Sequence, residues 1–215
     1  MSNGSDSPST VYDLRPFDAF RSLEDRVFEL LSDALTDGAP TPVAVMLTGG
    51  GTPRGLYRRL AAAPLRAGPN VHAVLSDERH VPAESPESNI GMIRPMLQAI
   101  GLPQARTLRV RTDLPLTAAA DDFDARLAAF FESGGRLTLA ILGLGSDGHV
   151  ASLFSAADIE ACGCRHAIPV SRPAPPHRVS VTPRVLEQAD RLIFMTAGPG
   201  KRDAVDALLQ APCSI

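Results

Sequence analysis

Tryptophan is absent from the 215-residue sequence, lysine occurs only once, and there are three cysteines. A small and odd number of cysteines does not suit a disulfide framework, so a cytoplasmic location is expected. No apolar run approaches the length of a membrane-spanning helix, and the N-terminus lacks the apolar core of a signal peptide. The sequence therefore predicts no association with membranes.

Neither sign of charge predominates, because the formal net charge is only −3. This balance gives no bulk attraction to nucleic acid, so no nucleic-acid partner is expected. Hydrophobic residues make up 44% of the chain and charged residues 21%, which is typical of a soluble enzyme-sized domain. The expected partner is a small molecule, and the oligomeric state stays open between a monomer and a small homo-oligomer.

Candidate metal ligands are few. Cys162, Cys164 and His166 are close in sequence, but a fourth ligand is missing and their spacing differs from that of common zinc sites. Ordinary loop residues are the favoured interpretation. Neither a metal nor another cofactor is expected.

The chain is organised as alternating strand and helix patterns. Residues 1–10 are polar and rich in Gly, Ser and Pro, and are expected to be disordered, whereas residues 11–215 are expected to form a single α/β catalytic domain. Alternation predicts βαβ units in a doubly wound, mainly parallel sheet with helices on both faces. The expected strands span residues 43–47, 71–75, 107–110, 137–142, 178–182 and 192–196, and the expected helices begin near residues 17, 54, 88, 117, 150 and 201.

One stretch, Leu137 to Phe154, combines a buried strand with chemically active residues. The strand ends in two glycines, a turn carries Asp147 and His149, and the apolar residues from Val150 predict the start of a helix. Ligands of α/β proteins bind at the carboxyl edge of the sheet, where such a turn lies. A carboxylate and an imidazole two residues apart are suited to proton transfer, which indicates a catalytic loop.

The spacing of Gly143, Gly145 and Gly148 also satisfies the dinucleotide fingerprint G-x-G-x-x-G. Asp147 would then lie where a pyrophosphate must approach, and no acidic residue ends a strand about 20 positions later. The motif also lies far from the first βαβ unit. A dinucleotide site is therefore rejected.

The turn after the first strand, Thr48 to Pro53, reads T-G-G-G-T-P and is typical of a phosphate cradle. Consecutive glycines let backbone N–H groups approach an anion, two threonine hydroxyls add donors, and the following helix presents its positive end. The alternative is a glycine-rich turn required only for tight strand-to-helix geometry, and this motif alone does not separate the two.

Two further loops carry ionisable residues. Asp77, Glu78, Arg79 and His80 directly follow a buried strand, which favours a polar ligand site over a solvated surface loop. The single lysine, Lys201, stands at a helix start, where an ammonium group opposes the helix dipole unless an anion binds there. A solvated surface lysine explains it equally well when this residue is taken alone.

Together these loops resemble the glucosamine-6-phosphate isomerase/6-phosphogluconolactonase family, and the lactonases most closely. The resemblance extends from Val43 to Leu209 and implies the fold of sugar-phosphate isomerases and CoA-transferase-like proteins. Ser76 stands where the family usually has an aromatic residue. The segments that carry the resemblance, in chain order, are T-G-G-G-T-P, S-D-E-R-H-V-P with S-N following, G-L-G-S-D-G-H-V-A-S-L-F, H-R-V-S-V-T-P and G-P-G-K.

The resemblance implies hydrolysis of 6-phospho-D-glucono-1,5-lactone, a step of the pentose phosphate pathway. His149 would be the general base that takes a proton from the attacking water. Asp147 would orient the imidazole or bind a sugar hydroxyl, and Arg79 or N–H groups of the central loop would stabilise the oxyanion. The residues implied to bind substrate or phosphate are Thr48, Gly49, Gly50, Gly51, Thr52, Asp77, Gly145, Arg178 and Lys201.

Alternatives remain for the base and for the reaction. His80 and His177 are the rival bases. An amino-sugar-phosphate isomerase or deaminase on the same fold would carry an acidic residue shortly after D-G-H, and residues 151–156 contain none. A non-enzymatic sugar-phosphate sensor would not need the Asp147 and His149 pair.

Overall fold

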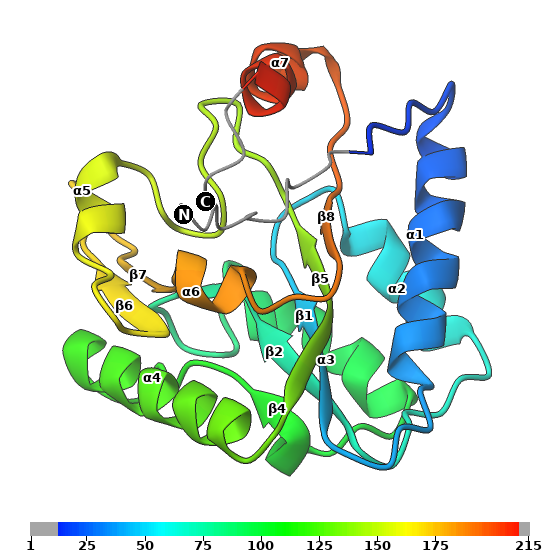
Figure 1. Cartoon of the computed structure of the whole chain (residues 1–215), viewed down its shortest axis with the longest axis horizontal. Coiled ribbons are helices and arrows are strands. Elements are labelled where there is room, and N and C mark those ends of the chain that lie inside the picture. Colours follow the sequence, from blue (N-terminus) through cyan, green and yellow to red (C-terminus); the bar gives the residue numbers. More distant parts are fainter. Residues whose placement is uncertain (1–12, 211–215) are drawn as a thin grey trace, which may run out of the picture.

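The structure, a computed structural model, describes residues 13–210, so the predicted disordered segment 1–10 lies outside the described residues. Its centre is a five-stranded sheet with the order β4-β2-β1-β5-β8, in which every neighbouring pair is parallel. Figure 1 shows these strands running side by side through the middle of the molecule. The strands are β1 (Val43–Leu47), β2 (Val71–Leu75), β4 (Thr107–Leu108), β5 (Arg136–Leu142) and β8 (Leu192–Phe194).

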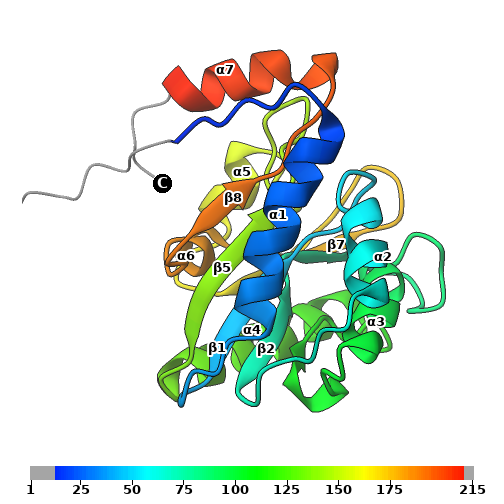
Figure 2. The ribbon, with the colours of Figure 1, turned by 90° about the vertical axis from the view of Figure 1, so that its right-hand side faces the viewer.

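Helices cover both faces of this sheet, as predicted. α1 (Phe20–Leu35), α2 (Arg54–Ala62) and α3 (Asn89–Ala99) share a hydrophobic core with one face, and α4 (Leu116–Glu132) shares a second core with the other. Figure 1 shows α1 on one side of the strands and α4 on the other, and Figure 2 shows α1 running along the strands. The doubly wound architecture follows from this arrangement.

The apolar sequence of β1 explains how one strand serves both cores. All five of its residues are buried. Because successive side chains of a strand point to opposite faces, Val43, Val45 and Leu47 pack toward α1, α2 and α3. Ala44 and Met46 pack toward α4. A strand buried on both faces is expected to be continuously apolar, and this is the pattern that made β1 predictable.

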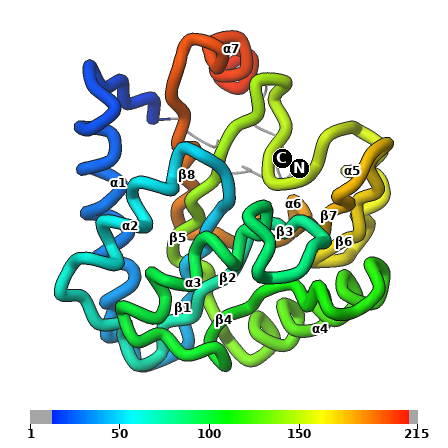
Figure 3. Tube along the Cα trace, turned by 180° about the vertical axis from the view of Figure 1, so that it is seen from behind, coloured from blue at the N-terminus to red at the C-terminus, as the bar shows by residue number. Residues whose placement is uncertain are grey.

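A second, antiparallel sheet has the order β3-β7-β6 and lies beside α4 (Figure 3). Its strands are β3 (Asp77–Arg79), β7 (Arg178–Val181) and β6 (Ala167–Val170). The sequence predicted a strand at 178–182 but none at β3 or β6. Three charged residues form β3 and Pro169 interrupts β6, so neither segment has the apolar alternation that marks a strand.

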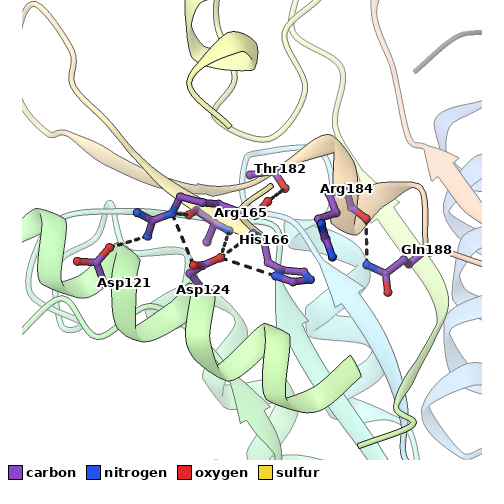
Figure 4. A network of polar contacts seen from close by, with 8 residues as sticks. Asp121, Asp124, Arg165, His166, Thr182, Arg184 and Gln188 are labelled. Atoms are coloured by element: carbon purple, nitrogen blue, oxygen red, sulfur yellow. Dashed lines mark hydrogen bonds and ion pairs between the residues drawn. The ribbon is translucent and has the colours of Figure 1, made fainter. Parts of the chain in front are cut away.

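A polar network fastens α4 to the smaller sheet (Figure 4). Asp124 accepts the backbone N–H of His166 at 2.6 Å, and Arg165 forms an ion pair with Asp121 at 2.6 Å. The carbonyl of Arg165 accepts the hydroxyl of Thr182 at 2.6 Å. Side chains of α4 thereby satisfy backbone groups at the start of β6, which fixes the edge of the small sheet.

The helix predicted from Val150 is wrong. Val150 instead forms isolated bridges with Leu144 and Leu153, and the backbone of Ala151 has a φ of 52°. A residue in this left-handed region cannot continue an α-helix. The chain first closes a compact loop, and the helix α5 (Ala156–Glu160) begins only after it.

The remaining elements agree with the expected order, with shifted bounds. A 3₁₀ turn at Gln104–Arg106 precedes β4, which is shorter than the predicted strand 107–110. α6 is Pro183–Leu186, and a 3₁₀ turn at Pro199–Lys201 leads into the last helix, α7 (Arg202–Gln210). None of the helices in the described part of the chain combines the length and apolarity needed to cross a membrane.

The hydroxyl of Tyr57 holds the end of β1, and its removal should destabilise the protein. This buried hydroxyl donates to the Thr48 carbonyl at 2.8 Å and accepts the Thr48 N–H at 3.2 Å. Burial raises the pKa of Tyr57, so its hydroxyl stays protonated. For Tyr57→Phe, we expect the free energy of unfolding in urea to fall by about 1–3 kcal/mol, the cost of leaving buried backbone groups unpaired. An unchanged free energy at an unchanged denaturant slope would contradict this role.

Candidate active site

A cavity of about 230 Å³ opens at the carboxyl edge of the central sheet. The turns after β1 and β5 form part of its wall, and these strands are neighbours. From β1 the chain proceeds to β2 and β4 on one side, and from β5 to β8 on the other, so this edge is the topological switch point where α/β proteins bind ligands. Ten predicted site residues line it: Thr48, Gly49, Gly50, Gly51, Thr52, Asp77, Arg79, Gly145, His149 and Lys201.

The turn after β1 presents backbone donors to the cavity. Gly50 has a φ of +102°, a conformation that favours glycine. No side chain caps the first turn of α2, so N–H groups at this helix N-terminus have no partner within the helix. Backbone amides together with the positive end of a helix dipole are the groups that favour an anion. The turn thus lies where a phosphate cradle was predicted, and phosphate binding there stays a prediction.

Asn89 is a cavity residue that the sequence did not assign to the site. A β-carbon on Gly49 would overlap the Asn89 amide, which shows how closely the two approach. Asn89 donates to the carbonyl of Asp77 at 3.0 Å. The available signal was the S-N pair after the second loop. The other lining residues outside the prediction are Pro53, Gly143, Leu144, Ala151, Met195 and Thr196.

The carboxylate of Asp77 joins three loops at the base of the cavity. One oxygen accepts the Ser76 hydroxyl and the other the Ser152 hydroxyl, both at 2.8 Å. The Ser76 hydroxyl also lies 3.2 Å from that of Thr48, and the Ser152 N–H donates to Ser180 at 3.1 Å. Ser76 therefore has a polar role here, because it connects the turn after β1 to Asp77.

Glu78 does not face the cavity, unlike its neighbours Asp77 and Arg79. Its fully buried carboxylate accepts backbone N–H groups of Asn89 and Ile90 at 2.7 Å each, and so caps the N-terminus of α3. Burial raises the pKa of Glu78, and these hydrogen bonds oppose the rise. In the second loop, Asp77 and Arg79 therefore line the cavity, whereas Glu78 stabilises the fold.

His149 and Asp147 form a hydrogen-bonded pair. The imidazole Nδ1 lies 2.6 Å from the Asp147 carboxylate, which also accepts the His149 backbone N–H at 3.3 Å. The imidazole hydrogen bond holds the pKa of Asp147 below its usual range. Because an ionised carboxylate only accepts, Nδ1 carries the proton and Nε2 is left as the basic nitrogen. The ring lines the cavity and is half-buried, with 30% of the side chain exposed.

The rival bases are engaged elsewhere, and neither lines the cavity. His80 Nε2 lies 2.8 Å from the carbonyl of Leu114, which can only accept, so this nitrogen is a donor. His177 Nδ1 accepts the backbone N–H of Arg172 at 3.1 Å. Both imidazoles fix loops, and His149 is the histidine with a basic nitrogen at the cavity.

Three cationic side chains were predicted at the site, and two of them line the cavity. Arg79 and Lys201 line the cavity, and Arg79 also donates to the carbonyl of Glu87 at 2.6 Å. Arg178 pairs with Arg79 across β3 and β7 but is not a lining residue, and its guanidinium donates to the carbonyl of Pro176. Burial, followed by the nearby charge of Arg79, lowers the pKa of Arg178.

Metal-binding geometry is not apparent in the described chain. Within residues 13–210, no three His, Cys, Asp or Glu side chains come together as potential ligands. Cys162 and Cys164 are free thiols, one buried and one exposed. The polar groups that line the cavity include an imidazole, backbone amides and two cations.

Comparisons with known proteins identify the family and the fold. The family model described as glucosamine-6-phosphate isomerases/6-phosphogluconolactonase matches residues 16–214. The chain is 33% identical to the 6-phosphogluconolactonase of Homo sapiens over 183 residues, which cover 80% of this chain and 70% of that protein. It is 32% identical to the one of Haemophilus influenzae, covering 80% and 75%. The structure of 6-phosphogluconolactonase from Thermotoga maritima superposes with a TM-score of 0.71 at 27% identity, covering 88% of this chain and 86% of that one, which confirms the expected fold.

Gly145 is required for the imidazole and carboxylate pair, and its substitution should break that pair. A β-carbon at this position would overlap His149 Nδ1 and Asp147 Oδ1, whereas a β-carbon on Gly143 would meet no atom within 4 Å. For Gly145→Ala, we expect the downfield Nδ1–H resonance of His149 in proton NMR spectra to disappear while the fold persists. Gly143→Ala is the matched control and should retain the resonance. Its retention in both variants would show that the pair does not depend on Gly145.

Proposed function

The chain belongs to the glucosamine-6-phosphate isomerase/6-phosphogluconolactonase family, and from that premise we propose that it hydrolyses 6-phospho-D-glucono-1,5-lactone to 6-phospho-D-gluconate. One observation carries the proposal. The imidazole of His149, the glycine turn after β1 and Lys201 line the same cavity. A base and an anion clamp within one cavity suit a sugar that carries a phosphate at one end and a lactone carbonyl at the other.

The phosphate binds at the turn after β1. Backbone N–H groups of Gly49, Gly50 and Gly51 and the hydroxyl of Thr52 donate to its oxygens, with the α2 dipole behind them. Lys201, which lines the same cavity, supplies a compact positive charge. Arg178, outside the lining, contributes at longer range beside Arg79. Binding energy from the phosphate thus positions the reacting end of the sugar.

The reaction begins when His149 Nε2 takes a proton from a water molecule that attacks C1 of the lactone. Asp147 holds the ring in the tautomer that leaves Nε2 basic and stabilises the imidazolium that forms. Arg79 stabilises the oxyanion, because the Gly145 N–H already donates to the carbonyl of His149 at 2.8 Å. The bond between C1 and the ring oxygen then breaks, and the imidazolium returns its proton to that oxygen. An ester carbonyl with an alkoxide leaving group needs no metal or cofactor for these steps.

The isomerase or deaminase alternative has less support. The first acidic residue after D-G-H is Asp158. Its carboxylate accepts the backbone N–H of Phe154 and the hydroxyl of Ser155, both at 2.9 Å, so it caps α5 instead of facing the cavity. A passive sensor would not require a base at the cavity.

The free thiols Cys162 and Cys164 suit a cytoplasmic enzyme, which is the location we propose.

His149→Ala should remove turnover without removing binding. General base catalysis contributes about a hundredfold to ten-thousandfold to rate, and we expect a loss of that size in kcat. The measurement is lactone hydrolysis corrected for spontaneous ring opening, with 6-phosphogluconate binding followed by calorimetry. His72→Ala is the control, because His72 lies near the start of β2, at the end of the strand away from the cavity. Full turnover in His149→Ala would exclude this residue from the mechanism.

Lys201→Ala should weaken capture of the phosphorylated substrate specifically. A hydrogen bond to a charged group contributes about 1.5–3 kcal/mol, so KM for the phosphorylated lactone should rise roughly tenfold to a hundredfold. KM for the phosphate-free glucono-1,5-lactone should stay unchanged. Arg202→Ala removes the adjacent exposed cation, which is not a lining residue, and serves as the matched control. An equal rise for both lactones would contradict the phosphate role.

A further inference from the structure

Three side chains are stacked from the cavity wall outward. The His149 imidazole packs against the Phe154 ring, with 4.6 Å between centroids and an interplanar angle of 47°. The guanidinium carbon of Arg172 lies only 3.7 Å from the centroid of the Phe154 ring. We propose that Phe154 and Arg172 are positioning residues that hold the His149 imidazole in its reactive orientation. This inference rests on the proposed function of His149 as the base.

The imidazole needs a second support beyond Asp147. The Asp147 side chain is 63% exposed, and a hydrogen-bonded pair of such exposure is a weak restraint. The pair involves only Nδ1, at one edge of the ring. An aromatic contact adds attraction over the ring face and restricts the plane of the ring. Phe154 therefore adds a constraint to that of the exposed carboxylate.

Phe154 is itself fixed at the start of α5. Its backbone N–H donates to Asp158 at 2.9 Å, and Asp158 also accepts the hydroxyl of Ser155, whose oxygen accepts the Asp158 N–H at 3.3 Å. This pattern is related to a capping box, but Asp158 accepts the N–H of Phe154, the residue before the N-cap Ser155. The Phe154 side chain packs against a small buried cluster consisting of Leu153, Cys162, Ile168 and Val170. The ring thus has a rigid base although it lies in a loop.

Arg172 closes the stack from the connection between β6 and β7. Within residues 13–210, Arg172 makes no ion pair with a carboxylate, so its charge is directed at the face of Phe154. Its backbone N–H donates to His177 Nδ1 at 3.1 Å, and the His177 carbonyl accepts the His80 N–H at 2.9 Å. The rival base His177 thereby acquires a role, because it anchors the arginine that braces Phe154.

The first test separates positioning from substrate binding. For Arg172→Met, we expect kcat for the phosphorylated lactone to fall about tenfold with KM unchanged, because an ångström-scale misplacement of a reacting group costs up to about 100-fold. Arg172→Lys keeps a cation over the ring and should recover most of kcat. Arg59→Met removes another guanidinium that lies 4.8 Å from a phenylalanine ring, that of Phe28, and should leave kcat unchanged. Unchanged kcat in Arg172→Met, or a rise in KM alone, would overturn the inference.

The second test addresses the anchor. The Asn side chain can place its oxygen near the position of a histidine Nδ1, so His177→Asn should retain the acceptor for the Arg172 N–H, whereas His177→Ala loses it. We expect His177→Ala to resemble Arg172→Met in kcat and His177→Asn to resemble the wild type. Equal kcat in both His177 variants would overturn the anchoring role.

A third measurement does not depend on activity. Ring currents from Phe154 should shift the carbon-bound protons of the His149 imidazole, and Arg172→Met should move those resonances toward their values in an unstacked histidine. Wild-type protein without lactone hydrolysis would refute the proposed function but leave this spectroscopic prediction intact. Unmoved resonances in Arg172→Met would refute the stack even in an active enzyme.

Discussion

The buried carboxylate of Asp77 is the contact on which the geometry of the site depends. It is 7% exposed, and the hydroxyls of Ser76 and Ser152 donate to its two oxygens in place of water. Burying an ionised carboxylate costs several kcal/mol unless donors replace water. Because Ser76 also contacts Thr48, and Ser152 follows His149 by three residues, one carboxyl group connects the turn after β1 to the loop that carries His149.

The central sheet was predictable because a strand that is buried on both faces has a continuously apolar sequence. β1 and β2 are apolar runs flanked by turn residues, and the structure begins and ends both strands at the predicted positions. The strand order was not visible, yet the position of the site did not require it. The carboxyl ends of parallel strands share one edge, so Thr48, Asp77 and His149 were expected together from chain direction alone, and they line one cavity.

The parts that were missed depend on contacts between segments distant in sequence. Glu78 reads like a site residue because it lies between Asp77 and Arg79, but strand alternation turns it toward the orphan amides of α3. The apolar residues after His149 read like a helix, but closure of the loop places Ala151 in the left-handed region. Asn89 approaches the site only because α3 packs beside the turn after β1. Spacing along the chain carries none of this information.

The two parts of the proposed site depend on different interactions, which explains why one of them was easier to recognise in the sequence. The proposed phosphate site consists of backbone amides in a turn whose glycines are explained by the positive φ of Gly50 and by the close approach of Gly49 to Asn89. At the reactive end, the position of His149 depends on side chains that stack through space, Phe154 and beyond it Arg172. A hydrogen bond to the exposed Asp147 sets which nitrogen is basic, but a tautomer alone does not aim that nitrogen at a carbonyl. In the proposed function, affinity for the phosphate is therefore encoded locally, whereas the proposed positioning of His149 depends on how the loop between β6 and β7 packs against the loop after β5.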